Sequence, residues 1–240
     1  MKEINLVISG GGVKLFYFIG MYYFFKKLQD KKIIKFKSYS AISSGSVFIV
    51  LMACNINIHL LLKTYKKYII LFHQRHRLCF SKMLLLKHFL YEILPKDAHI
   101  LCTNKVYISM TQIDSFPRKV TFNKFKSKKD LIEILLASSS FPFLVNKNIY
   151  YKYKNHKYID GCFTDNTPII KSFDTIIFKP FLTGRINLFS LEKLSDIKNI
   201  KKGFDDTKKF FLNTDKTLSL DWYKNESSIY KYILYFIKNE

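Results

Sequence analysis

Twice in its first 54 residues the chain runs from a short apolar segment, through a turn of small residues, into an apolar helix-forming segment. Residues 4–9 read as a strand and 13–27 as the helix that follows. The stretches KSYSAIS (37–43) and SVFIVLMAC (46–54) repeat the pattern. Two such units in succession predict neighbouring parallel strands, because each helix returns the chain to the same end of the sheet. The sequence therefore predicts an α/β fold.

The rest of the chain extends this pattern within one expected domain, residues 1–240. Helices are predicted over 58–94, interrupted by HQRHR at 73–77 and stopped by Pro95. The remaining predicted elements are the strands KVYISMTQID, RKVTFNKF, KYID and DTIIFKP, the helix KDLIEILLASSS, and two helices near 204–213 and 226–238. About six strands result, which suits a three-layer α/β/α sandwich with a mostly parallel central sheet and its ligand site at the carboxyl ends of the strands.

The charge of +22, from 40 Lys+Arg against 18 Asp+Glu, favours polyanionic partners such as nucleic acid or an anionic membrane. Of the basic residues, 36 are lysine, whereas base recognition favours arginine, so specific nucleic-acid binding is not expected. The cysteines form no C-x-x-C pair, and neither a zinc site nor a disulfide framework is predicted. They are Cys54, Cys79, Cys102 and Cys162.

The apolar run 15–25 has 11 residues between Lys14 and Lys26, well short of the ~20 that cross a bilayer. Three glycines precede it and no small-residue cleavage site follows, which argues against a secretory signal. We expect a reduced, intracellular protein, cytoplasmic or peripheral on membranes.

Gly10, Gly11 and Gly12 lie between the first strand and its helix, where their amides can bind an anion or a developing oxyanion. A dinucleotide-binding fingerprint would require glycine in place of Leu15, and no Gly-Lys-Ser/Thr follows to make a phosphate-binding loop. A plain tight turn remains an alternative.

The second turn carries the pattern Ala41-x-Ser43-x-Gly45. A nucleophile elbow needs small residues on both sides of its serine, because the bend from strand to helix is sharp. This register makes Ser43 the candidate nucleophile. The hydrolase order of serine, acid and then histidine is disfavoured, since no histidine follows His156.

The stretch YIDGCFTDNTP (158–168) offers another base. Asp160 ends a predicted strand, and Gly161 permits a sharp turn that projects the carboxylate from the edge of the sheet. An aspartate can accept the serine proton directly. An ordinary Asp-Gly turn is the competing interpretation.

Together these motifs resemble the patatin-like phospholipase family over about residues 4–180, leaving a helical C-terminal part, 181–240. The matching segments, in the family's order, are Gly10–Lys14, Ala41–Gly45, ASSSFPFLV at 137–145, and Asp160–Gly161 with Asn166 and Pro168 behind it.

The resemblance implies a Ser–Asp dyad that cleaves fatty acyl esters of phospholipids or related lipids without calcium, metal or cofactor. Ser43 would be the nucleophile and Asp160 the base. The oxyanion hole would be formed by Gly10, Gly11, Gly12 and the turn at Lys14, with Ala41, Gly45 and Gly161 supporting the turns. The implied partners are a lipid substrate and an anionic membrane surface.

Three residues depart from the family pattern: Leu15 and Ala41 replace glycines, and Cys162 stands where glycine or alanine is usual. Ala41 costs little unless its φ is positive. Leu15 is the main support for an alternative, a catalytically silent protein of the same fold that binds anionic lipid or another polyanion. A nucleic-acid binder is a third alternative.

Overall fold

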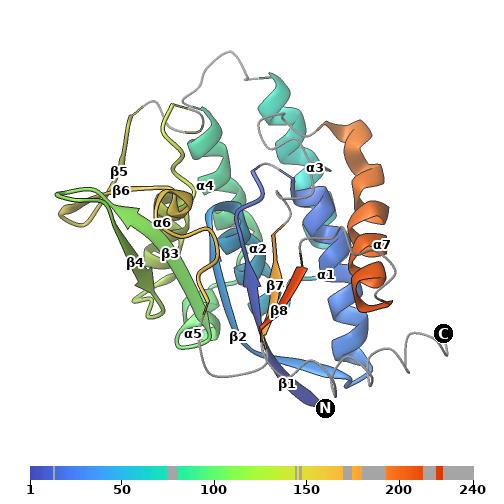
Figure 1. Cartoon of the computed structure of the whole chain (residues 1–240). Helices are drawn as coiled ribbons and strands as arrows, with labels where there is room; N and C mark the ends of the chain where they lie inside the picture. The colour runs from blue at the N-terminus through green and yellow to red at the C-terminus, as the bar shows by residue number, and fades with distance from the viewer. Residues whose placement is uncertain are drawn as a thin grey trace.

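In the computed structural model, shown in Figure 1, a central β-sheet packs with one of its faces against the described helices. The structure describes residues 1–12, 14–74, 81–143, 145, 148–169, 175–179, 193–212 and 220–223. The strands are β1 (Lys2–Ile8), β2 (Ile34–Ile42), β3 (Val106–Gln112), β4 (Arg118–Phe122), β5 (Tyr151–Tyr153), β6 (His156–Ile159), β7 (Thr175–Phe178) and β8 (Leu220–Tyr223). The α-helices are α1 (Leu15–Asp30), α2 (Ser43–Ala53), α3 (Ile58–Gln74), α4 (Ser81–Ile93), α5 (Ala98–Cys102), α6 (Lys128–Ser138) and α7 (Lys198–Leu212).

The described strands form one sheet in the order β5-β6-β3-β2-β1-β7-β8, with β4 paired to β3. Its centre, β3-β2-β1-β7, is parallel, whereas the remaining pairs at both edges are antiparallel. The predicted α/β class is confirmed. The short strands β5 and β8 bring the described sheet to eight strands, compared with about six expected.

The register of the central strands fixes where the loops meet. Ile8, at the end of β1, pairs with Ala41 of β2, and Ala41 pairs with Ile108 of β3. All three strands run in the same direction, so the glycine loop after β1 and the elbow after β2 leave the sheet side by side.

The expected helices form where the sequence supplies caps. The Asn57 side chain accepts hydrogen bonds from the first amides of α3, those of His59 and Leu60. The Ser127 hydroxyl accepts from the Asp130 amide at the start of α6. Within the described segments, no helix is both long enough and apolar enough to cross a membrane.

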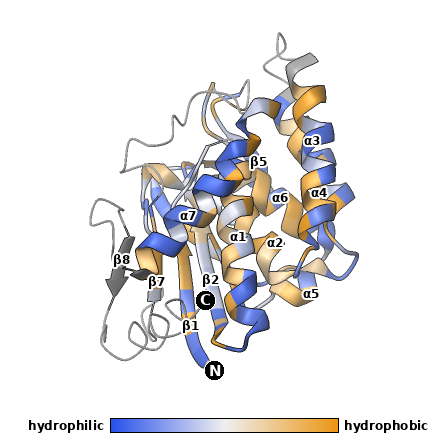
Figure 2. Ribbon diagram, turned by 90° about the vertical axis from the view of Figure 1, so that its right-hand side faces the viewer, coloured by the Kyte–Doolittle hydropathy of each residue, from blue (hydrophilic) through white to orange (hydrophobic). Residues whose placement is uncertain are grey.

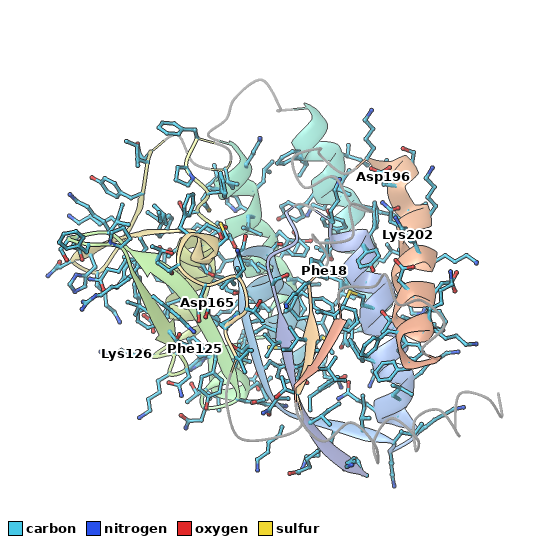
Figure 3. The ribbon with its side chains drawn as sticks, in the orientation of Figure 1. Phe18, Phe125, Lys126, Asp165, Asp196 and Lys202 are labelled. Carbon is cyan, nitrogen blue, oxygen red and sulfur yellow. The ribbon has the colours of Figure 1, made fainter. Side chains whose placement is uncertain are left out.

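Helices α1, α2, α6 and α7 share one hydrophobic core with the side of the sheet that carries Ile4, Leu6 and Ile8. Phe18, at the inner side of α1 in Figure 3, stacks on Phe48 of α2 with ring centroids 4.9 Å apart. In Figure 2, α7 has blue and orange stretches, as expected of an amphipathic helix with one face on the core.

Helix α7 confirms the helix predicted near 204–213 and crosses α1 at close range (Figure 1). A Cβ on Gly20 would lie 1.9 Å from the carbonyl oxygen of Ile200, and one on Gly203 would lie 2.1 Å from that of Tyr17. Only glycine permits these backbones to approach so closely. The Tyr17 hydroxyl also donates to buried Asp206. The helix expected near 226–238 lies outside the described residues.

Candidate active site

The turn from β2 to α2 contains no connecting residue: β2 ends at Ile42 and α2 begins at Ser43. Ser43 has a φ of 53°, in the left-handed region of the backbone that residues other than glycine seldom adopt. A Cβ on Gly45 would lie 2.6 Å from the carbonyl oxygen of Ser9, so a bare glycine lets α2 approach the end of β1. Ala41 has no positive φ, and its methyl group therefore carries no backbone strain.

Asp160 directly follows β6 and caps the short 3-10 helix Gly161–Phe163. Its carboxylate accepts a hydrogen bond from the Cys162 amide (3.0 Å). Gly161 is held tightly, since a Cβ there would lie 2.7 Å from the carbonyl oxygen of Ser109. The backbone on both sides of the carboxylate is thus fixed by packing and hydrogen bonds.

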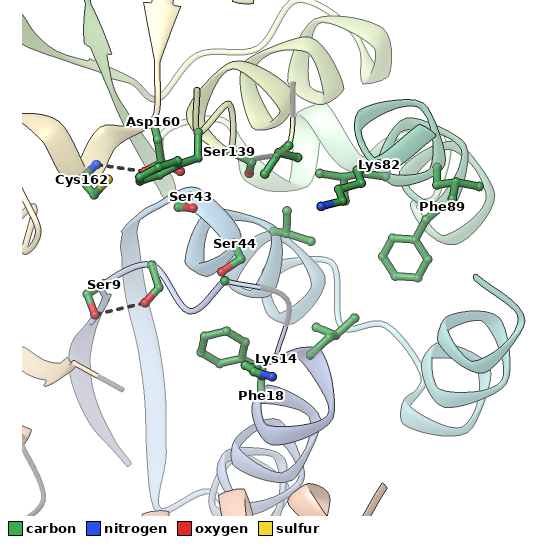
Figure 4. Close-up of a pocket in the computed structure, with 18 of the residues that line it drawn as sticks. Ser9, Lys14, Phe18, Ser43, Ser44, Lys82, Phe89, Ser139, Asp160 and Cys162 are labelled. Atoms are coloured by element: carbon green, nitrogen blue, oxygen red, sulfur yellow. Dashed lines mark hydrogen bonds between the residues drawn. The ribbon is translucent and has the colours of Figure 1, made fainter. Parts of the chain in front are cut away.

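The structure brings Ser43 and Asp160 together, although 116 residues separate them in the sequence (Figure 4). Only 2% of Asp160 is exposed, and this burial raises the pKa of its carboxyl above the ordinary value. Hydrogen bonds from the Ser43 side chain and the Cys162 amide act in the opposite direction and lower that pKa. A buried carboxyl with a raised pKa, next to a serine, is a suitable acceptor for the serine proton.

The glycine loop lies against the elbow. The Gly11 amide donates to the Ser44 hydroxyl (2.8 Å), and a Cβ on Gly11 would lie 2.4 Å from the Phe18 ring. Gly12 has a φ of 56°, and Lys14 is the buried N-cap residue of α1. Val13 lies outside the described residues. Because Ser44 takes the Gly11 amide, oxyanion binding by Gly11 requires that bond to be shared or released.

A cavity of about 570 Å³ opens at this point and extends between the helices (Figure 4). Ser43, Asp160 and the glycine loop form its polar end. Its walls are largely apolar and include Val47 of α2, Tyr65, Ile69 and Phe72 of α3, and Leu85, Leu86 and Phe89 of α4. Leu15 also lines this cavity in the first turn of α1. The arrangement joins a nucleophile and a base to a space for a long apolar chain.

The described histidines lie elsewhere. Nδ1 of His156 is 2.7 Å from the Asp114 carboxylate, in a surface pair beside the β5–β6 hairpin. Hydrogen bonds from the Gln112 side chain, the Lys157 amide and the His156 ring lower the pKa of Asp114 to about 2. No histidine is among the described residues that line the cavity. The described part of the chain also contains no cluster of three metal-ligating side chains.

Two arrangements were not predicted from the sequence. The sulfur atoms of Cys54 and Cys102 lie 3.8 Å apart as free thiols, and hydrogen bonding to Cys54 together with burial raises the pKa of Cys102. The buried Ser138 hydroxyl accepts a hydrogen bond from the Ser43 amide (3.0 Å). The segment containing Ser138 was recognised as a motif, but nothing in the sequence indicated this contact.

The family model described as patatin-like phospholipase matches residues 6–171, more than half of the chain. The chain belongs to the patatin-like phospholipase family. The recognised motifs lie within or at the edges of the matched segment, and α7 lies beyond it. The resemblance inferred from the motif order is confirmed.

Curated relatives of this patatin-like chain include human patatin-like phospholipase domain-containing protein 4, 34% identical over 42% of this chain and 39% of the relative. Another is the mouse omega-hydroxyceramide transacylase, 26% identical over 74% of this chain and 30% of the relative. The chain thus matches well under half the length of each. The solved structure of VipD from Legionella pneumophila aligns with a TM-score of 0.39 at 13% identity, over 75% of this chain and 50% of that one.

Proposed function

We propose that this patatin-like protein is a serine lipid acyl hydrolase that cleaves fatty acyl esters of phospholipids or related lipids through a Ser43–Asp160 dyad, without calcium. The observation that carries the proposal is the position of this pair. A serine in a strained elbow lies beside a buried carboxylate, at the polar end of a cavity of about 570 Å³. The family membership supports the same class of chemistry.

In the first step the Ser43 hydroxyl oxygen attacks the ester carbonyl carbon while its proton passes to the Asp160 carboxylate. Amides of the loop Gly10–Lys14 stabilise the negative charge on the carbonyl oxygen. The intermediate collapses, the bond to the alcohol breaks, and the leaving alkoxide takes the proton from Asp160. An acyl-enzyme and a free alcohol, such as a lysolipid, result.

In the second step water attacks the acyl carbon and passes a proton to Asp160. The fatty acid leaves as the bond to Ser43 breaks, and Ser43 regains its proton. An alcohol in place of water would make this step a transacylation, the activity for which the mouse relative is named. The cavity has room for on the order of 20 methylene-sized groups, which suits a long acyl chain.

We also propose that the protein binds anionic membrane surfaces peripherally. Its net charge is +22, and each lysine near an anionic surface contributes about 1 kcal/mol. Exposed aromatic rings lie near the cavity: Phe163 is 50% exposed, and its ring is 5.2 Å from that of Phe141, a cavity-lining residue. Phe143 in the same region is 71% exposed.

A fluorophosphonate probe, which reacts with activated serines, tests the dyad. Wild type is expected to be labelled and to release fatty acid from mixed phospholipid vesicles, and Ser43→Ala is expected to do neither. Ser115→Ala, which removes an exposed serine in the β3–β4 turn, is the control that keeps both activities. Wild-type turnover by Ser43→Ala would refute the proposal. Lipid binding by an unlabelled, inactive wild type would favour the catalytically silent alternative.

A further inference from the structure

Ser138, the last residue of α6, is fully buried, and its hydroxyl joins three elements. It accepts a hydrogen bond from the Ser43 amide at 3.0 Å and donates one to the Ser109 carbonyl of β3 at 2.7 Å. The Ser46 hydroxyl of α2 lies 3.3 Å from it. Because its proton is directed to Ser109, its lone pairs are available to the elbow.

This contact replaces a missing cap. The first amides of a helix have no partner within the helix and usually receive one from the side chain of the N-cap residue. The N-cap residue of α2 is Ile42, whose side chain has no acceptor, and it makes no capping hydrogen bond. Ser138, on another helix, therefore supplies the acceptor for the Ser43 amide. Ser43 is also the residue whose φ of 53° lies in the left-handed region.

The same short segment also holds the proposed base. Two residues after Ser138, the Ser140 carbonyl accepts a hydrogen bond from the Asp160 amide at 3.0 Å. The segment 138–140 thus bonds the backbone of Ser43 through a side chain and that of Asp160 through a carbonyl. These two bonds set the position of each backbone relative to the segment 138–140, and hence relative to each other.

We propose that Ser138 is a positioning residue, which holds the strained elbow so that the Ser43 hydroxyl points at Asp160. The inference rests on the proposed function, in which Ser43 is the nucleophile. Without the Ser138 hydroxyl, the Ser43 backbone loses the bond that opposes its relaxation, and the hydroxyl moves away from the carboxylate. Ser138 touches neither the substrate nor the reacting atoms, so it acts only through Ser43.

The test uses Ser138→Ala in the full chain, with a short-chain soluble ester, the fluorophosphonate probe and thermal unfolding. A misplacement of the nucleophile by about 1 Å is expected to lower kcat roughly 10- to 100-fold. The labelling rate constant should fall by a similar factor, while KM stays within about twofold because the cavity is unchanged.

Ser38→Ala is the matched control, because it also removes a buried serine hydrogen bond, to Asn5 on the neighbouring strand. It is expected to lower the melting temperature without changing kcat or labelling. If Ser138→Ala does not fold, Ser138→Cys, which keeps a weak acceptor, is expected to show a smaller fall in both rates.

A folded Ser138→Ala with wild-type kcat and labelling rate would overturn the positioning role while leaving the dyad intact. The same holds for Ser138→Cys where that variant is the one measured. Failure of the wild-type protein to react with the probe would instead refute the proposed function itself. The two failures are therefore distinguishable.

Discussion

The apolar cavity leads to a prediction about acyl-chain length that one substitution on α4 can test. Leu86 lines the cavity from α4, and replacing it with tryptophan directs a larger side chain into the apolar part of that space. An indole in place of the leucine side chain fills room for roughly two methylene groups. Each buried methylene contributes about 0.8 kcal/mol, so a chain that fills the cavity loses about 1.6 kcal/mol of binding.

That loss corresponds to a fall of roughly 15-fold in kcat/KM for a long-chain ester. An ester too short to reach Leu86 should be cleaved as by wild type. The assay compares nitrophenyl esters from butyrate to palmitate in detergent micelles. Leu84→Trp is the matched control, because Leu84 lies on the same helix but is 51% exposed and is not among the described cavity-lining residues. An unchanged chain-length profile in Leu86→Trp, or the same change in Leu84→Trp, would contradict acyl binding in this cavity.

Asp160→Asn should abolish turnover, yet it should raise the free energy of unfolding at neutral pH. The gain is about 1.4 kcal/mol for each tenfold change that burial causes in the acid constant of the carboxyl group. Urea titration measures this free energy, and an unchanged or lower stability would argue against a buried charge. Phe143→Ser with Phe163→Ser should weaken binding to anionic vesicles by at least about tenfold, whereas Phe116→Ser, which changes a ring that is 90% exposed in the β3–β4 turn, should not. Flotation assays that find equal binding would show that Phe143 and Phe163 do not contribute to membrane binding. Gly203→Leu should lower the free energy of unfolding by about 3 kcal/mol or more, because its Cβ meets the α1 backbone, and calorimetry showing no loss would contradict the close crossing of α1 and α7.

Much of the fold followed from local patterns. The switch from strand-like to helical periodicity located β1, α1, β2 and α2, and Pro95 marked the end of the region that forms α3 and α4. The ends of α2 were less accurate, since that helix begins at Ser43 itself. Strands β5 and β8 were missed because their segments are only three and four residues long and lack a distinctive pattern.

The candidate site was predictable as a set of residues, because Ser43 and Asp160 each follow a strand and carry glycine neighbours typical of sharp turns. What the sequence could not indicate was which distant groups would hold them. The contact of Ser138 with Ser43 spans 95 residues, and the two cysteine sulfurs 3.8 Å apart come from positions 48 residues apart. Such pairs depend on how helices pack on the sheet, which no local pattern encodes.

The site combines two features that each oppose folding. A serine at φ 53° costs on the order of 1–3 kcal/mol. Burial raises the pKa of Asp160, so the native state binds its proton more tightly than the unfolded chain does. The stability associated with the protonated carboxyl is present below the unfolded pKa and is lost as the pH rises through the folded pKa.

The hydrogen bonds that Ser138 and Ser140 accept from the Ser43 and Asp160 amides offset part of the cost of the strained serine and the buried carboxyl, as does the hydrogen bond that the Cys162 amide donates to Asp160. A fold selected only for stability would gain from glycine at position 43 and asparagine at position 160. Serine and aspartate are, however, the residues that the proposed reaction requires at these two positions. The raised pKa of Asp160 also predicts how turnover depends on pH. As the pH is lowered, the turnover rate should begin to fall at a higher pH than it would with an ordinary aspartate, because Asp160 must lose its proton to act as the base and burial favours the protonated form.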